Sequence, residues 1–176
     1  MMRRATGLPE DAGFSLLESV FAMAVLTVVA LGLLPLGMMA THTTENQGHL
    51  VARATEYAQD KMEQLLALSY GDALTDTRVF PAADTGGSGL AVGGSANPAS
   101  PSALYVDYLD INGTLITGTG GNAPADWFYK RVWQVQAPTG TTNLKEITVT
   151  AIVKSASGSV GRVPQATIKS IKTFPF

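Results

Sequence analysis

Few side chains in this 176-residue sequence stand at spacings that could support chemistry. Asp107, Asp110 and Asn112 are grouped as in a calcium-binding loop. The EF-hand template, aligned on Asn112-Gly113, however places tyrosine and threonine at the first and last ligand positions, where carboxylates are needed. We therefore expect a hairpin turn there, with only a looser calcium loop left open.

Other candidate sites lack the partners that their chemistry requires. His42 and His49 are seven residues apart with no third metal ligand close by, so we interpret both as solvated side chains. The sequence has no cysteine, which excludes a disulfide, a thiolate metal site and a cysteine nucleophile. It also has no Gly-x-Ser-x-Gly turn for a serine nucleophile. We predict no enzymatic activity, no metal and no cofactor.

Glu18 is the ionisable residue in the least expected place. The 26 residues between Glu18 and Glu45 contain no Asp, Glu, Lys or Arg, a run longer than the roughly 20 apolar residues that cross a bilayer. An unpaired carboxylate near that run costs about 2.5–3.5 kcal/mol on membrane insertion scales. Arg3 and Arg4 before it fit a cleaved export signal or an uncleaved anchor with a cytoplasmic N-terminus. Neither interpretation accounts for Glu18.

The segment from Gly13 to Glu18, GFSLLE, resembles the class III signal of type IV pilins and type II secretion pseudopilins. This resemblance implies that a prepilin peptidase cuts between Gly13 and Phe14 and methylates the new amino terminus of Phe14. Glu18 would then be the fifth residue of the mature chain and would pair with the Phe14 ammonium of a neighbouring subunit. Such pairing offsets the desolvation of both charges and fixes axial register.

The sequence divides into five regions on this interpretation. We expect a leader over 1–13, a transmembrane assembly stem over 14–44, an amphipathic half of the same helix over 45–70, a Gly/Ser/Pro-rich variable loop over 71–103 and a β head over 104–176. Pro35 lies inside the stem and is expected to bend the helix there. Gly71 offers a stop signal for the helix.

Apolar spacings of three and four define the buried face expected for the amphipathic half. That face comprises Val51, Ala54, Ala58, Met62 and Leu65, with Arg53, Glu56, Asp60, Lys61 and Glu63 expected on the other faces.

Strand patterns dominate the C-terminal region. We expect strands over 104–109, 115–117, 127–135, 147–153 and 163–174, with a hairpin at Asn112-Gly113. Trp127, Tyr129, Trp133 and Val135 are expected to share one face. Since the connections between these strands are short, we expect them to pair antiparallel. The predicted fold is therefore α+β, with a long N-terminal helix packed on a roughly four-stranded antiparallel sheet, as the resemblance to pilins also implies.

Three further segments, 57–65, 131–135 and 144–149, look like those of PilV-like minor pilins. This resemblance implies a low-copy subunit that primes or caps a type IV pilus. Its partners would be the prepilin peptidase, other pilins and minor pilins, the inner-membrane assembly platform and the inner membrane. The protein would lie in the inner membrane before assembly and in a cell-surface or periplasmic filament afterwards.

The sequence leaves two alternatives open. One is a minor pseudopilin of type II secretion. The other is a filament-displayed adhesin or DNA-binding pilin, although a net charge of −2 gives no general case for nucleic-acid binding. From 104 to 176 there are seven bases against four acids, and these bases are the candidate DNA contacts: Lys130, Arg131, Lys145, Lys154, Arg162, Lys169 and Lys172.

Overall fold

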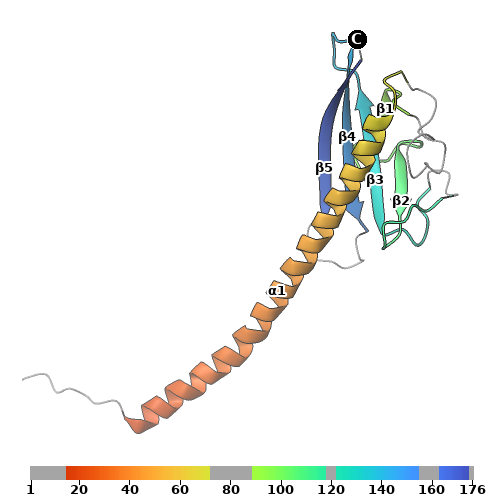
Figure 1. Cartoon of the computed structure of the whole chain (residues 1–176). Coiled ribbons are helices and arrows are strands. Elements are labelled where there is room, and N and C mark those ends of the chain that lie inside the picture. The colour runs from red at the N-terminus through yellow and green to blue at the C-terminus, as the bar shows by residue number, and fades with distance from the viewer. Residues whose placement is uncertain (1–14, 72–88, 118–121, 155–162, 175–176) are drawn as a thin grey trace, which may run out of the picture. The chain divides into compact units, whose positions relative to one another are not determined.

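The computed structural model describes residues 15–71, 89–117, 122–154 and 163–174. The chain divides into two compact units, Met1–Glu45 and Asn46–Phe176. The second unit, called the head below, contains the end of the helix and an antiparallel sheet (Figure 1). The predicted α+β arrangement, with a long N-terminal helix packed on an antiparallel sheet, is confirmed.

Helix α1 runs from Leu16 to Ala67 and continues through Pro35. It ends before Gly71, the expected stop. The Lys172 ammonium donates to the carbonyls of Leu66 and Leu68 at this end. A cation there satisfies carbonyls that have no partner within the helix and complements its dipole.

The sheet contains five strands in the order β1-β3-β4-β5, and β2 also pairs with β3. Every pairing is antiparallel. The strands are β1 (Gly93–Gly94), β2 (Val106–Leu109), β3 (Tyr129–Gln136), β4 (Leu144–Val153) and β5 (Gln165–Thr173).

Strand β1 lies within the region that we expected to be an irregular loop. Its glycines are required because other parts of the head pack closely against them. A side chain on Gly94 would collide with the Trp133 carbonyl and the Tyr105 ring. The positive φ of Gly94, 82°, is also unfavourable for other residues. Leu90, just before this strand, is fully buried in the core.

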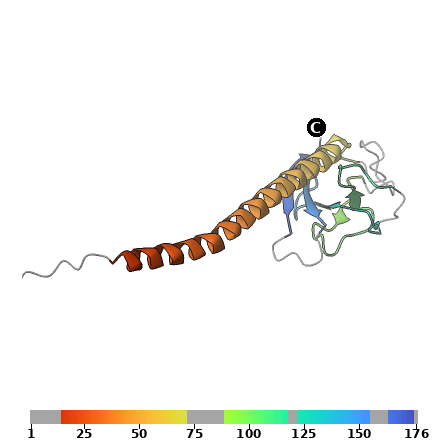
Figure 2. The ribbon, with the colours of Figure 1, turned by 90° about the horizontal axis from the view of Figure 1, so that it is seen from below.

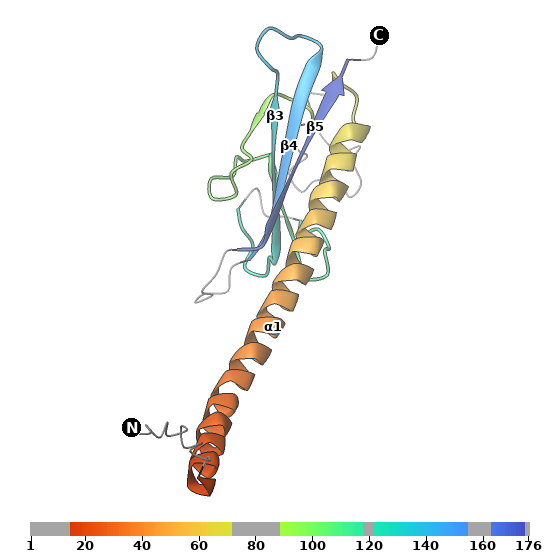
Figure 3. The same cartoon turned by 90° about the vertical axis from the view of Figure 1, so that its left-hand side faces the viewer.

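The core of the head lies between α1 and one face of the sheet (Figures 2 and 3). Ala54, Ala58, Met62 and Leu65 of the helix are buried as predicted. Val51 is not, since 41% of it is exposed. On the sheet side the core is formed by alternating residues of two strands, which are Trp133 and Val135 of β3 and Ile147, Val149 and Ala151 of β4.

The opposite face of the sheet carries a smaller apolar cluster of Val106, Tyr108 and Val132, with Trp127 packed against it. Strand alternation places Val132 on the other side from Trp133. The prediction that Trp127 shares a face with Trp133 is therefore wrong. Trp127 precedes β3, so the alternation that we extended to it does not apply.

Candidate functional site

The first part of α1 presents a bare apolar surface. From Leu16 to Glu45 every residue is exposed, including large side chains such as Phe21 and Leu26. The helix is long and apolar enough to cross a membrane, and none of its most apolar window is buried in the chain. This segment is compatible with a single-pass membrane anchor.

Hydroxyl side chains within this segment are satisfied by the helix itself. The Thr27 hydroxyl donates to the Met23 carbonyl at 2.8 Å, and the Thr43 hydroxyl donates to the Met39 carbonyl at 2.8 Å. Such bonds let a threonine enter an apolar environment without an unsatisfied donor.

Glu18 differs from these hydroxyls. It lies in the first turn of α1, is exposed, and has no hydrogen-bond or ion-pair partner among the residues that the structure describes. The helix dipole stabilises a carboxylate placed near the N-terminus of a helix. Gly13 and Phe14, the expected processing residues, lie outside the described residues.

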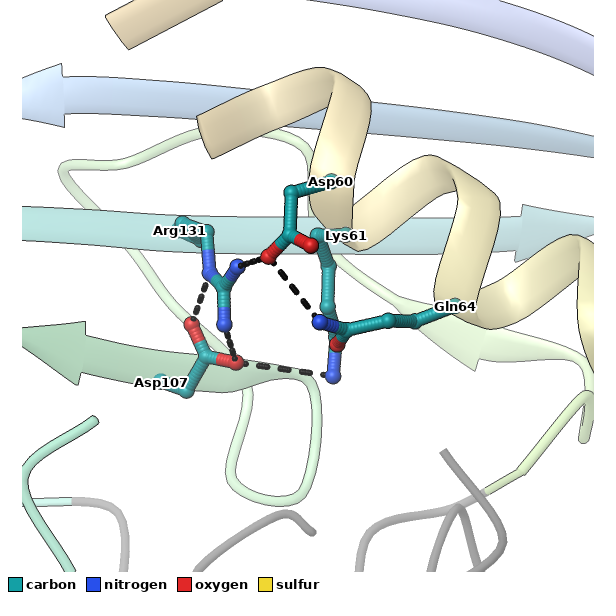
Figure 4. A network of polar contacts seen from close by, with 5 residues as sticks. All are labelled: Asp60, Lys61, Gln64, Asp107 and Arg131. Atoms are coloured by element: carbon teal, nitrogen blue, oxygen red, sulfur yellow. Dashed lines mark hydrogen bonds and ion pairs between the residues drawn. The ribbon is translucent and has the colours of Figure 1, made fainter. Parts of the chain in front are cut away.

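A buried ionic network, absent from our sequence-based expectations, connects α1 to two strands of the head (Figure 4). Arg131 of β3 donates twice to Asp107 of β2, from Nε to Oδ1 at 2.7 Å and from Nη2 to Oδ2 at 2.9 Å. Its Nη1 donates to Oδ2 of Asp60 on the helix at 2.7 Å. The Asp60 carboxylate is half exposed, whereas Arg131 and Asp107 are buried.

Lys61 completes this network from the helix. Its ammonium lies 3.4 Å from Oδ2 of Asp107 and 4.1 Å from the centroid of the Trp133 ring, and its side chain is 0% exposed. The prediction that Lys61 lies on a face other than the buried one is wrong. Gln64 also belongs to the network, because its Nε2 donates to Asp60 at 2.9 Å.

The charges of this network stabilise one another. Burial alone would raise the pKa of Asp107, but the Arg131 guanidinium and the Lys61 ammonium together hold it below its ordinary value. Burial alone would lower the pKa of Arg131, but Asp107 and then Asp60 raise it. Asp107 and Arg131 therefore stay ionised at neutral pH. The network ties the helix to β2 and β3 in one register.

The sequence did contain a signal for the position of Lys61. It lies seven residues after Ala54, three after Ala58 and four before Leu65, so helical geometry places it on the same stripe. Its charge nevertheless set it apart from the apolar residues that defined the expected buried face. No comparable signal identifies Asp107 as its partner, because that contact depends on the pairing of β2 with β3.

The suspected calcium residues do not meet around one site. Asp107 faces Arg131 and Lys61 in the buried network. Asp110 instead closes a turn, since its Oδ1 accepts from the backbone N–H groups of Asn112 and Thr114, both at 2.8 Å. Within the described residues, no three acidic, histidine or cysteine side chains are placed to hold a metal.

That turn is a hairpin, as expected, but its loop is longer than the two residues Asn112-Gly113. The Asp110 carbonyl accepts from Gly113 N–H at 3.1 Å, and Asp110 N–H donates to the Thr114 carbonyl at 2.9 Å. Gly113 has a φ of 85°, whereas Asn112 has no positive φ. This pattern is a three-residue loop in which only the glycine is left-handed. The second strand of this hairpin, expected over 115–117, consists of one bridge, between Leu109 and Leu115.

The candidate DNA contacts are mostly engaged within the head. Arg131 is buried and cannot form part of a surface. Lys145 donates to the carbonyls of Tyr70 and Leu90, both at 2.7 Å, and Lys172 caps the helix. Lys169 pairs with Glu146 at 2.9 Å, and Arg162 lies outside the described residues.

Two of these cations, Lys130 and Lys154, stand near the Trp127 ring. His42 and His49 are exposed on α1. The seven bases therefore do not form one continuous basic surface over the described part of the head.

No protein-family model, no curated protein and no solved structure matches this chain. The class that the structure itself defines is an α+β head built on the second half of a helix whose first half is apolar and exposed.

Proposed function

We propose that this chain is a prepilin-type minor pilin, a structural subunit that takes part in type IV pilus assembly. The observation that carries this proposal is Glu18, a carboxylate at the start of a bare apolar helix that has no partner among residues 15–71, 89–117, 122–154 and 163–174. In lipid such a group is unfavourable unless it finds a cation. An assembly in which apolar stems pack side by side supplies that cation from another subunit.

The cation would be the amino terminus of Phe14, produced when a prepilin peptidase removes residues 1–13. Cleavage after Gly13 leaves the whole apolar segment in place while adding a charge at its end. The GFSLLE motif supports this, and so does a helix that runs without interruption from the apolar segment to the head. A minor pseudopilin of type II secretion would use the same groups, and genomic neighbours would distinguish the two systems.

In this proposal the protein is anchored in the inner membrane before assembly and enters a cell-surface or periplasmic filament afterwards. Its partners are the peptidase, other pilins and the assembly platform. This proposal assigns no catalytic role to the head. The buried network holds the second half of α1 against the sheet of the head.

Processing is tested by measuring the intact mass of the protein expressed with and without a prepilin peptidase. We expect a peptidase-dependent loss of residues 1–13, with or without one added methyl group. A Gly13→Val variant should stay full length, because the bulkier side chain blocks the cleavage position. An unshortened wild-type chain with an active peptidase would contradict the proposal.

Assembly is tested separately with Glu18→Gln. This variant keeps the size and polarity of the side chain but removes its charge, so it should still be shortened by the peptidase. We expect it to co-purify with sister pilins much less than the wild type does. Equal recovery would show that Glu18 does not pair between subunits. Thr27→Val, a change elsewhere in the stem, is the matched control.

A further inference from the structure

The head has a hollow of about 530 Å³ on the sheet face opposite α1. Its floor is a row across three neighbouring strands, since Lys130 of β3 pairs with Ile152 of β4, which pairs with Gln165 of β5. Trp127 and the segment around Pro98 also line it. The volume lies in the range of small-molecule sites, about 300–1,000 Å³.

Two lysines of this hollow have their ammonium groups over the Trp127 ring. The ammonium groups of Lys130 and Lys154 each lie 5.4 Å from the ring centroid. Lys130 donates to the Pro98 carbonyl at 2.6 Å, and Lys154 donates to the Ala125 carbonyl at 2.7 Å. These bonds hold both cations over the ring. An ammonium has three donors, so each can still donate to a ligand.

The charge of the hollow is of one sign. None of its described lining residues is acidic. Burial lowers the pKa of Lys130, which shows that its ammonium is partly stripped of water without a carboxylate in compensation. An anion placed here would restore that lost stabilisation.

The remaining lining groups suit a ring that carries hydroxyls. The Trp127 indole offers a flat apolar surface, and Ile152 and Val163 add further apolar lining. The amides of Asn97 and Gln165 also line the hollow and offer donors and acceptors, although Oδ1 of Asn97 already accepts from Ala99 N–H at 3.0 Å.

We propose that this hollow binds an acidic saccharide, with a sugar ring against Trp127 and its carboxylate between Lys130 and Lys154. A nucleic-acid strand fits less well, because it needs a continuous run of cations along the backbone. The next lysine on this sheet face, Lys169, is already paired with Glu146. The site lies wholly within the head, so the proposal does not depend on leader processing or on pilus assembly.

The test uses the full-length protein in detergent micelles, with trigalacturonate as the probe and its fully methyl-esterified form as the neutral match. Binding is measured by titration calorimetry and by quenching of tryptophan fluorescence. We expect saturable binding of the acid and at least roughly tenfold weaker binding of the ester, the loss expected for one charge-assisted contact. The Lys130→Gln/Lys154→Gln variant should bind the acid no better than the ester.

Two further variants separate the site from general effects. Trp127→Phe keeps an aromatic face and should retain part of the affinity, whereas Trp127→Ala should lose it. Lys169→Gln removes a lysine from the same sheet face outside the hollow and should bind like the wild type. Thermal midpoints of all variants identify any that fail to fold, and the lysine variant then remains as the deciding one.

Three results would overturn the proposal. The first is an absence of saturable binding by the wild type. The second is equal affinity for acid and ester, or unchanged affinity in Lys130→Gln/Lys154→Gln. The third is displacement of bound trigalacturonate by oligothymidylate at a lower concentration than by the acid itself, which would assign the hollow to nucleic acid.

Discussion

Replacing Asp107 by asparagine should destabilise the head more than any other single change in the ionic network. Its carboxylate accepts two bonds from Arg131 and lies 3.4 Å from the Lys61 ammonium, and all three side chains are at most 2% exposed. Asparagine keeps the size but removes the charge, which leaves two buried cations without their shared anion. Breaking a buried pair in this way costs about 3–5 kcal/mol. Asp60 still accepts from Arg131, so we expect a value near the lower end.

The matched control is Lys61→Met, which removes a charge from the same network with a different consequence. Methionine fills nearly the same space beside Trp133, and Asp107 keeps both of its bonds to Arg131. The loss of attraction to Asp107 is offset because a buried ammonium no longer has to be desolvated. Replacing a buried charge by an apolar side chain of similar volume is often close to neutral, so we expect a change of about 1 kcal/mol or less.

Both variants are measured by urea unfolding of the full-length protein in micelles. Unfolding is followed by tryptophan fluorescence, to which Trp133, 1% exposed when folded, contributes together with Trp127. A typical domain has about 5–15 kcal/mol of stability, so the expected difference between the two variants is easily resolved. If Lys61→Met costs as much as Asp107→Asn, then Asp107 is not held chiefly by Arg131. Our assignment of the dominant pair would then be refuted.

Three further predictions concern other parts of the head. The pKa of Asp107 is lower in the fold than its ordinary value of 3.8, so its contribution to stability is complete above about pH 4 and is lost as the pH falls through the folded value. Urea unfolding measured against pH should show this decline, and the Asp107→Asn variant should show a flatter dependence. Gly94→Ala should lower the free energy of unfolding by about 2 kcal/mol or more, because the backbone strain of a positive φ is added to collisions with neighbouring groups. Gly140→Ala, with a φ of 81° but open space around it, should lower it by only about 1 kcal/mol, and thermal unfolding measures both. Lys172→Gln should weaken the end of α1 by about 0.5–1 kcal/mol, seen as faster hydrogen exchange in its last turn, while Lys169→Gln, an exposed pair, should leave exchange there unchanged.

The sequence predicted the helix and the sheet because both depend on local periodicity. Spacings of three and four placed Ala54, Ala58, Met62 and Leu65 on one face, and alternation in 147–153 gave β4 its buried side. The hydrophobic effect follows such patterns directly, so they were sufficient for the fold class. They failed at Trp127, where alternation was extended beyond the end of the strand.

The ionic network and the cap of α1 could not be predicted in the same way. Arg131 alternates in register with Tyr129 and Trp133, so its buried position followed from the strand pattern, yet its charge favoured an assignment to the surface. Whether a charge can be buried depends on a partner that is distant in sequence, here Asp107 and Asp60. Lys172 reaches the carbonyls of Leu66 and Leu68 across more than 100 residues, a contact that no local pattern contains.

These long-range contacts have a consequence for the time at which the head forms during synthesis. The second half of α1 is made early, but Lys61 meets its anion only after residue 107 is present, and Asp60 waits for residue 131. The carbonyls at the end of the helix wait for β5, the last strand. Contacts between residues so far apart form late because a long loop has to close first. We therefore expect ribosome-bound or shortened chains that end before Lys172 to be digested readily by protease, and the completed chain to become resistant in a single step.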